Sequence, residues 1–170
     1  MDLTAFVRDV PDYPKPGILY RDLTPLFSDH AAFRSAVGQV SEPFRTQKVD
    51  YVLGIESRGF LLGGPVALEL GVGFVLVRKA GKLPRETLGV TYELEYGTDT
   101  VEMHVDAVGK GDRVLIVDDL LATGGTARAA IQLARDAGAE VLGCSFLVEL
   151  TGLHGRAALG VEDVHAVIQY

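Results

Sequence analysis

Two adjacent acids and a glycine turn stand close together in the segment best suited to chemistry. Residues 114–126 read Val-Leu-Ile-Val-Asp-Asp-Leu-Leu-Ala-Thr-Gly-Gly-Thr. Backbone N–H groups of such a turn can approach an anion closely, the threonines add hydroxyl donors, and a following helix favours negative charge at its start. Carboxylates suit a different partner, because a vicinal diol can donate two hydrogen bonds to Asp118 and Asp119 and a divalent cation can be held nearby. A diol beside a phosphate describes a ribose 5-phosphate.

Simpler or rival interpretations exist for each half of this segment. Thr123 or Thr126 could merely cap a helix, and the two aspartates could merely solvate the end of a strand. A P-loop NTPase should end its glycine loop in Gly-Lys-Ser/Thr, and this loop has no lysine. A phospho-acceptor receiver also places acids at strand ends, but it does not call for the Thr-Gly-Gly-Thr turn. Recognition of ribose 5-phosphate is therefore the favoured interpretation.

A second anion site is indicated by an uneven distribution of basic residues. The chain has 16 Lys and Arg against 23 Asp and Glu, which gives a formal charge of −7. This charge argues against a general nucleic-acid-binding surface and favours small-molecule chemistry. Within the acidic chain, Arg78, Lys79, Lys82 and Arg85 crowd one short stretch that contains Gly and Pro. We expect a local anion site there.

Short apolar runs alternate with helical patterns along the chain, which predicts an α/β fold with a mostly parallel central sheet flanked by helices. Strands are predicted at residues 51–55, 74–77, 114–117 and 141–148. Helices are predicted at residues 31–44, 59–70 and 126–137, the last ending at Gly138 as a left-handed cap.

Two shorter strands, at residues 91–94 and 100–105, are predicted to form an antiparallel hairpin around a turn-like Tyr-Gly-Thr-Asp. Polar and apolar residues alternate at 102–106, which indicates that one face of the second strand is exposed to solvent. In open α/β sheets ligands bind at the carboxyl ends of the parallel strands. The two aspartates and the glycine turn are therefore expected at that edge.

The N-terminal stretch, residues 9–25, contains four of the seven prolines and cannot be ordinary helix. A loop of this kind is either functional or disordered. Tyr13, Ile18, Leu19 and Tyr20 supply more apolar groups than a disordered segment usually carries. We expect the stretch to be ordered and to pack against the domain.

The overall numbers place few further limits on the chain. Its 170 residues suit one domain, numbered 1–170, and no apolar run is long enough to cross a bilayer. The first ten residues do not resemble a secretory signal, so a cytoplasmic location is expected. Cys144 is the single cysteine and lies in an apolar run, which predicts an inert core thiol. The four histidines show no spacing typical of a zinc site.

Residues 114–126 resemble the phosphoribosyl-pyrophosphate (PRPP) signature of the type I phosphoribosyltransferases. Other stretches are similar to the adenine phosphoribosyltransferases within that family, and the likeness spans nearly the whole chain. These are Tyr-Pro-Lys-Pro-Gly-Ile-Leu-Tyr-Arg-Asp-Leu-Thr-Pro at 13–25, Gly-Ile-Glu-Ser-Arg-Gly-Phe at 54–60, Arg-Lys-Ala-Gly-Lys-Leu-Pro at 78–84, Tyr-Glu-Leu-Glu-Tyr-Gly at 92–97 and Val-Glu-Leu-Thr at 148–151. The resemblance implies the type I phosphoribosyltransferase fold, with residues 1–27 as a small base-binding hood and with a flexible antiparallel hairpin.

The resemblance also assigns roles to individual residues. For the ribose and its 5-phosphate it implies Asp118, Asp119, Ala122, Thr123, Gly124, Gly125 and Thr126. For pyrophosphate it implies Glu56, Ser57 and Arg58, in a loop where family members often have a non-proline cis peptide, and Arg78, Lys79 and Lys82 on or beside the flexible loop. For adenine it implies backbone contacts from Leu19 and Arg21, with Tyr20, where many relatives have Phe, and Leu150 on the two ring faces. Glu95 matches the family's catalytic glutamate.

The reaction that this resemblance implies is adenine plus PRPP giving AMP plus pyrophosphate, a purine-salvage step. Mg²⁺ is the expected cofactor, held mainly through PRPP and water with no direct protein ligand, and a homodimer is the family expectation. Neither nucleic acid nor a membrane is an expected partner. Two alternatives stay open: a phosphoribosyltransferase for hypoxanthine or guanine, and a regulator that binds PRPP without catalysis.

Overall fold

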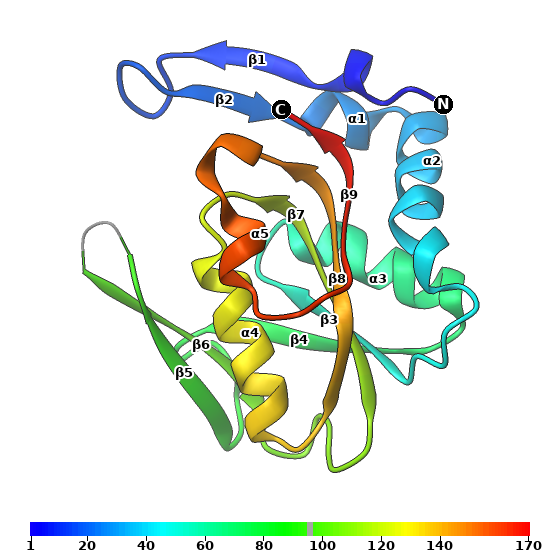
Figure 1. The fold of residues 1–170 in the computed structure, drawn as a ribbon, viewed down its shortest axis with the longest axis vertical. Coiled ribbons are helices and arrows are strands. Elements are labelled where there is room, and N and C mark those ends of the chain that lie inside the picture. The colour runs from blue at the N-terminus through cyan, green and yellow to red at the C-terminus, as the bar shows by residue number, and fades with distance from the viewer. Residues whose placement is uncertain (95–96) are drawn as a thin grey trace.

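The computed structural model of the chain describes residues 1–94 and 97–170, and a seven-stranded sheet forms its centre (Figure 1). The strands stand in the order β5 (Thr87–Glu93), β6 (Thr98–His104), β4 (Gly73–Lys79), β3 (Tyr51–Ile55), β7 (Arg113–Leu121), β8 (Glu140–Glu149) and β9 (Val164–Gln169). The last five strands in this order run parallel to one another, and β5 and β6 are antiparallel to their neighbours. The predicted mostly parallel sheet and its antiparallel hairpin are confirmed.

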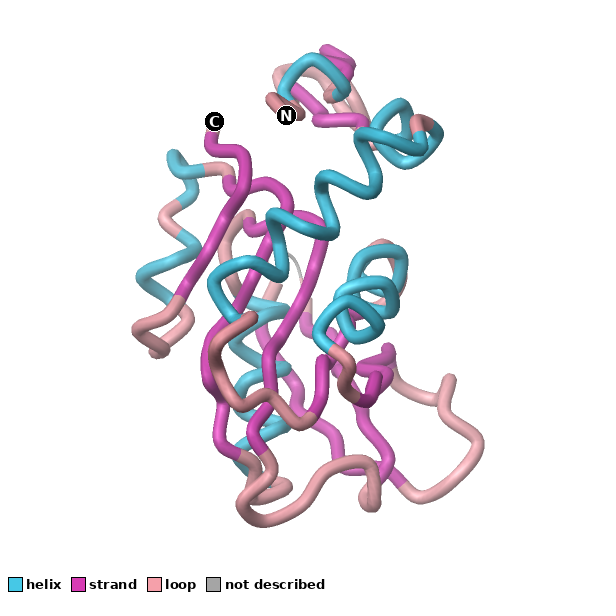
Figure 2. Tube along the Cα trace, turned by 90° about the vertical axis from the view of Figure 1, so that its right-hand side faces the viewer, coloured by secondary structure: helices cyan, strands magenta, loops and turns pink. Residues whose placement is uncertain are grey.

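Helices cover both faces of the sheet, as Figure 2 shows. One face packs against α2 (His30–Ser41) and α3 (Gly59–Leu70), and the other packs against α4 (Gly125–Asp136). Strand β7 illustrates why, because successive side chains of a strand point to opposite faces. Val114 and Ile116 lie in the core under α4, whereas Leu115 and Val117 lie in the core under α2 and α3. The unbroken apolar run is thus a strand buried on both sides.

A small antiparallel hairpin lies across the carboxyl edge of the sheet (Figure 1) and forms the predicted hood. It consists of β1 (Arg8–Pro11) and β2 (Leu19–Asp22), preceded by the short 3-10 helix η1 (Thr4–Phe6) and followed by α1 (Thr24–Ser28). The Arg21 guanidinium lies 3.7 Å from the centre of the Tyr170 ring, which joins the hood to the end of β9. The proline-rich stretch is therefore ordered and packed, as expected.

Several element bounds differ from the predicted ones for identifiable reasons. Helix α2 ends at Ser41 and is followed by the 3-10 helix η2 (Glu42–Phe44), because Pro43 has no N–H to donate. Strand β7 continues to Leu121, so the two aspartates lie within the strand and not after it. The sheet also gains β9 at its edge, which the sequence did not predict because its residues are mostly only half-buried.

The remaining elements join β8 to β9 and complete the chain. They are the 3-10 helix η3 (Thr151–Leu153) and the short helix α5 (Gly155–Ala158).

Cys144 is fully buried, as predicted, and burial raises the pKa of its thiol to about 12. None of the helices in the described ranges combines the length and the apolar composition that crossing a membrane requires.

Candidate functional site

A cavity of about 460 Å³ opens at the carboxyl edge of the sheet, next to the predicted anion turn. Its walls come from the turn after β3, from β4 and the loop that follows it, from β5, from β7 and from the start of α4. The residues that line it are Glu56, Ser57, Arg58, Lys79, Lys82, Tyr92, Asp118, Asp119, Leu120 and Thr126. A smaller hollow of about 100 Å³ adjoins it and is lined by Asp118, Leu120, Leu121 and residues 122–127. The sequence-predicted ribose, 5-phosphate and pyrophosphate residues are thus brought together, with one exception described below.

The adjacent acids of β7 are held in an environment that opposes their ionisation. Burial raises the pKa of Asp118 well above its usual value, and the charge of Asp119 adds to this effect. Burial also raises the pKa of Asp119, although Arg58 partly offsets it. The backbone N–H of Asp119 donates to Asp118 Oδ1 over 2.9 Å. Hydrogen bonds or positive charge from a ligand would therefore favour the ionised form of the pair.

One carboxylate oxygen of this pair lacks a hydrogen bond. Asp119 is only 4% exposed, and its Oδ2 atom lies 2.7 Å from Arg58 Nε in an ion pair. This contact does not have hydrogen-bond geometry, so within the described residues no donor satisfies Oδ2. A buried oxygen in that condition is costly, and a ligand hydroxyl that donates to it would remove the cost.

The small hollow has the shape of an anion cradle. Gly124 has a φ of +83°, which an L side chain rarely adopts, and it precedes the first residue of α4 with no side chain capping the helix. The N–H groups at this helix start therefore remain free to bind an anion. A Cβ atom at Gly124 would lie 2.6 Å from the carbonyl oxygen of Gly155, and a Cβ at Gly155 would lie 2.1 Å from that of Ala122. Two glycine backbones in close contact thus fix the cradle.

The lysines of the site are paired with carboxylates. Lys82 Nζ donates to Glu56 Oε1, while the backbone N–H of Lys79 donates to Glu56 Oε2 over 2.8 Å. Burial of Glu56 opposes its ionisation, but these hydrogen bonds outweigh burial and lower the pKa of the carboxyl. Lys79 Nζ pairs with Asp99, whose hydrogen bond raises the pKa of the ammonium. Lys79 therefore stays charged beside the cavity, and Lys82 is held beside it by Glu56.

Arg78 is the exception among the predicted pyrophosphate residues, because it does not line this cavity. Its Nε donates to Glu56 Oε2 over 3.2 Å, and its guanidinium also donates to the carbonyl of Lys82 over 3.1 Å. It therefore supports the basic loop from behind. The peptide bond between Glu56 and Ser57 is cis, as the family resemblance implied.

The predicted adenine residues lie at the same edge, beyond the 460 Å³ cavity. Leu19, Tyr20 and Arg21 belong to β2 of the hood. Leu150 is held next to the end of β7, because its N–H donates to the carbonyl of Leu121 over 2.9 Å. The Tyr20 hydroxyl accepts a hydrogen bond from Arg58, which is also the partner of Asp119. One arginine thus connects the hood to the acid pair.

The predicted catalytic residue, Glu95, lies outside the described residues.

Sequence reasoning gave no role to Gly155, which closes the cradle, or to Gly59, where a Cβ would lie 2.7 Å from Asp118 Oδ1. It also gave none to Tyr92, although this residue opens a quoted motif. In the described part of the chain, no group of three or more His, Cys, Asp or Glu side chains could hold a metal ion.

Comparison with known proteins gives a consistent result. Residues 28–164 match the family described as phosphoribosyl transferase domain. An adenine phosphoribosyltransferase of Thermobifida fusca is 56% identical over 165 residues, which cover 97% of this chain and 94% of that protein. A crystal structure of the Rhodothermus marinus adenine phosphoribosyltransferase is 55% identical, with a TM-score of 0.93 and coverage of 99% and 96%.

A more distant structure adds information about ligands. The Saccharomyces cerevisiae adenine phosphoribosyltransferase, complexed with D-2,5-dideoxy-2,5-imino-altritol 1,6-bisphosphate and adenine, is 43% identical. Its TM-score is 0.92, and the match covers 97% of this chain and 96% of that one. Fold, site geometry and near full-length similarity agree, and the chain belongs to the adenine phosphoribosyltransferase family of pentosyltransferases.

Proposed function

We propose that this protein transfers the phosphoribosyl group of PRPP to adenine, giving AMP and pyrophosphate in purine salvage. The observation that carries the proposal is the joining of an anion cradle at Gly124 to an acid pair with an unsatisfied buried oxygen on Asp119. A phosphate and a vicinal diol bound side by side would match a ribose 5-phosphate. The bisphosphate and adenine complex of the yeast relative supports the same pair of ligands.

In this proposal the 5-phosphate binds at residues 122–126 and the ribose hydroxyls donate to Asp118 and Asp119. Pyrophosphate oxygens take the place of the carboxylates that now hold the site's cations, Arg58, Lys79 and Lys82. These cations stabilise the negative charge that develops as pyrophosphate departs. Ser57 contributes a hydroxyl and the N–H of its loop. Glu56 and Arg78 act by ordering the basic loop, since Glu56 is an anion and Arg78 stands outside the cavity.

Adenine is proposed to bind between Tyr20 and Leu150, with its edge against the backbone of Leu19 and Arg21. Antiparallel pairs alternate along a strand, so residues two apart on β2 present their peptide groups on the same side. Backbone donors and acceptors in that row can distinguish a 6-amino group from a 6-oxo group. Glu95 is proposed to exchange a proton with the purine while C1 of ribose migrates from pyrophosphate to the ring nitrogen.

Mg²⁺ is the proposed cofactor, and the donor set fits it because hard carboxylate oxygens line the cavity. Asp118 and Asp119 would hold it through the ribose hydroxyls and water. When bound, Mg²⁺ supplies positive charge that neutralises the pyrophosphate oxygens. The chain's own residues position the two reactants and exclude water from the reacting carbon.

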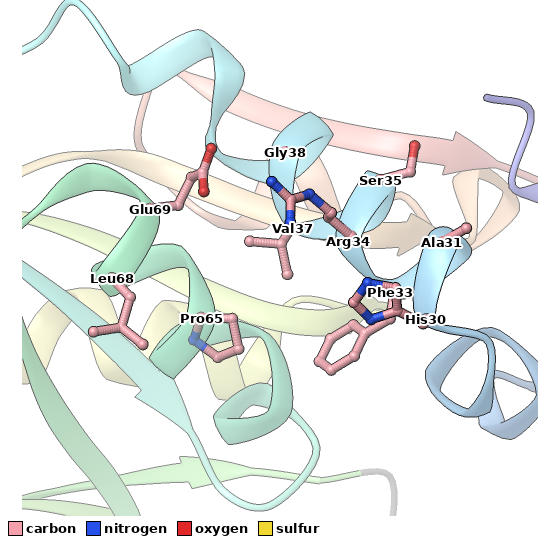
Figure 3. A pocket seen from close by; sticks show the side chains of 10 residues that line it. All are labelled: His30, Ala31, Phe33, Arg34, Ser35, Val37, Gly38, Pro65, Leu68 and Glu69. Atoms are coloured by element: carbon pink, nitrogen blue, oxygen red, sulfur yellow. The ribbon is translucent and has the colours of Figure 1, made fainter.

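A homodimer in the cytoplasm is the proposed state of the enzyme. A groove of about 790 Å³ runs between α2 and α3 on the face away from α4, and Figure 3 shows Phe33, Val37, Pro65 and Leu68 around it. Leu68 is 84% exposed. Apolar surface of this kind is typical of an interface with another protein, which supports the association of two copies.

The proposal is tested by offering the folded protein PRPP, Mg²⁺ and one base at a time, and by measuring the nucleotide formed. Adenine is expected to give AMP with a kcat/KM at least about 100-fold above those for hypoxanthine and guanine, because unpaired backbone groups would face a 6-oxo base. A preference for hypoxanthine or guanine would assign the chain to another purine. PRPP binding without base-dependent release of pyrophosphate would instead indicate a regulator.

The role of Glu95 is tested by the Glu95→Gln variant, which keeps the size of the side chain and removes its proton-transfer ability. We expect kcat to fall by about 100-fold or more, with the Kd for PRPP changed less than about threefold because the diol and phosphate contacts are intact. Single-turnover kinetics and equilibrium titration measure the two quantities. An unchanged kcat would remove Glu95 from the mechanism.

The cradle is tested by Gly124→Ala with Gly111→Ala as its matched control. Both glycines have a left-handed φ, +83° and +88°, but only at Gly124 does the new Cβ meet backbone, at 2.6 Å. We expect Gly124→Ala to raise the KM for PRPP by about tenfold or more, since strain of roughly 1–3 kcal/mol falls on the phosphate site. Steady-state kinetics should show a KM for PRPP within about twofold of the unmodified chain for Gly111→Ala, where only backbone strain remote from the site is added. Equal effects of the two variants would mean that the close contact with Gly155 does not shape the phosphate site.

A further inference from the structure

Tyr92 joins the hairpin to the anion cradle and has no role in the proposed chemistry so far. It stands near the end of β5, is 7% exposed and lines the 460 Å³ cavity. Its ring lies directly over the glycine turn, because a Cβ atom at Gly125 would be 3.5 Å from Tyr92 Cδ2 and 3.7 Å from the carbonyl oxygen of Glu93. The strand that leads to Glu95 is thus seated on the first residues of α4.

The phenol of Tyr92 is the centre of a short hydrogen-bond chain. Thr126 Oγ1 donates to the Tyr92 hydroxyl over 3.1 Å, and that hydroxyl donates to Asp99 Oδ2 over 3.3 Å. The same Asp99 carboxylate is the partner of Lys79 Nζ. Because burial raises the pKa of Tyr92, the phenol keeps its proton at neutral pH and can donate. The chain therefore runs from the phosphate cradle through the hairpin to a cation of the pyrophosphate side.

The arrangement cannot stay as it is when a phosphate occupies the cradle. A threonine hydroxyl has one proton to donate and two lone pairs that accept. If Thr126 donates to a phosphate oxygen, it can no longer donate to Tyr92, but it can accept from it. The bond between the two hydroxyls then reverses, and the Tyr92 proton leaves Asp99 for Thr126.

We propose that Tyr92 is a positioning residue that reports the occupancy of the 5-phosphate cradle to strands β5 and β6 and to the Asp99–Lys79 pair. The inference rests on the proposed function, because it takes the cradle ligand to be a sugar phosphate. A hydroxyl that donates to an anion is a better acceptor, so the reversed bond holds β5 more firmly against α4. Release from the phenol leaves the Oδ2 atom of Asp99 to Lys79, while Oδ1 still accepts from the backbone N–H of Thr100.

The test uses Tyr92→Phe, which keeps the buried ring and removes only the hydroxyl. Tyr51→Phe is the matched control, since Tyr51 is a half-buried tyrosine of β3 that lines a different cavity. Ribose 5-phosphate is the probe in hydrogen–deuterium exchange, read on peptides from residues 87–93 and 98–104. Turnover with adenine and PRPP is measured on the same proteins.

In the unmodified chain and in Tyr51→Phe, ribose 5-phosphate is expected to slow exchange in both strands of the hairpin. In Tyr92→Phe the ligand should still bind, with a Kd within about threefold, but the slowing should be lost, because both hydrogen bonds of the phenol have gone while the phosphate contacts remain. The kcat should fall about tenfold, equivalent to ~1.4 kcal/mol, with little change in the KM for PRPP. If Tyr92 had a purely structural role, the variant would not lose the ligand-dependent slowing of exchange while it kept its affinity for ribose 5-phosphate.

The outcomes distinguish this inference from the proposed function. Ligand-dependent slowing that persists in Tyr92→Phe, or a kcat equal to that of Tyr51→Phe, overturns the role of Tyr92. An active enzyme whose hairpin does not respond to ribose 5-phosphate overturns it as well and leaves the proposed function standing. A chain that makes no AMP, but in which the slowing depends on Tyr92, refutes the proposed function and supports the coupling.

Discussion

Asp118 and Asp119 are neighbouring carboxylates in a strand that is otherwise buried on both faces, and their placement costs free energy. Burial raises the pKa of both groups, and the charge of Asp119 raises the pKa of Asp118 further. One arginine offsets part of this cost, yet a buried oxygen of Asp119 keeps no hydrogen-bond donor among the described residues. Such unfavourable arrangements persist where a ligand relieves them. The cradle, the basic loop and the hood are all arranged around this pair.

Ion pairs join the positive and negative side chains of the site. Glu56 holds Lys82, Asp119 holds Arg58, and the third pair is that of Asp99 and Lys79. These ion pairs thus hold the cations close to the cavity. In the proposed function, binding of pyrophosphate would exchange one negative partner for another, which would cost less than desolvating free lysine and arginine side chains. Arg58 also donates a hydrogen bond to Tyr20, so it links the acid pair to the hood.

The sequence was informative wherever a physical requirement leaves a local pattern. Strands buried on both faces must be apolar throughout, which is why β3, β7 and β8 were predicted within a few residues. A backbone that binds an anion needs glycine and hydroxyl residues beside a helix start, and the turn at Gly124 was predicted for that reason.

What the sequence could not predict depends on contacts between remote segments. Gly155 lies 31 positions after Gly124, and only the packed backbone shows that neither position tolerates a Cβ. Arg78 is one basic residue among several, and only the structure shows that it bonds to Glu56 and does not line the cavity itself. In the sequence, Tyr92 looks like an ordinary buried strand residue. The partners of its hydroxyl come from β6 and α4, and only the structure shows them. Each of these roles follows from three-dimensional geometry alone.

The central claim is that the acid pair recognises the ribose diol. It is tested most directly by calorimetric titration with ribose 5-phosphate and with its 2-epimer, arabinose 5-phosphate, which turns one hydroxyl away. The unmodified chain should bind the ribose compound about tenfold more tightly, the equivalent of roughly one charge-assisted hydrogen bond. Asp119→Asn should lose most of that preference while it still binds the phosphate. Equal affinities of the unmodified chain for the two epimers would contradict the account.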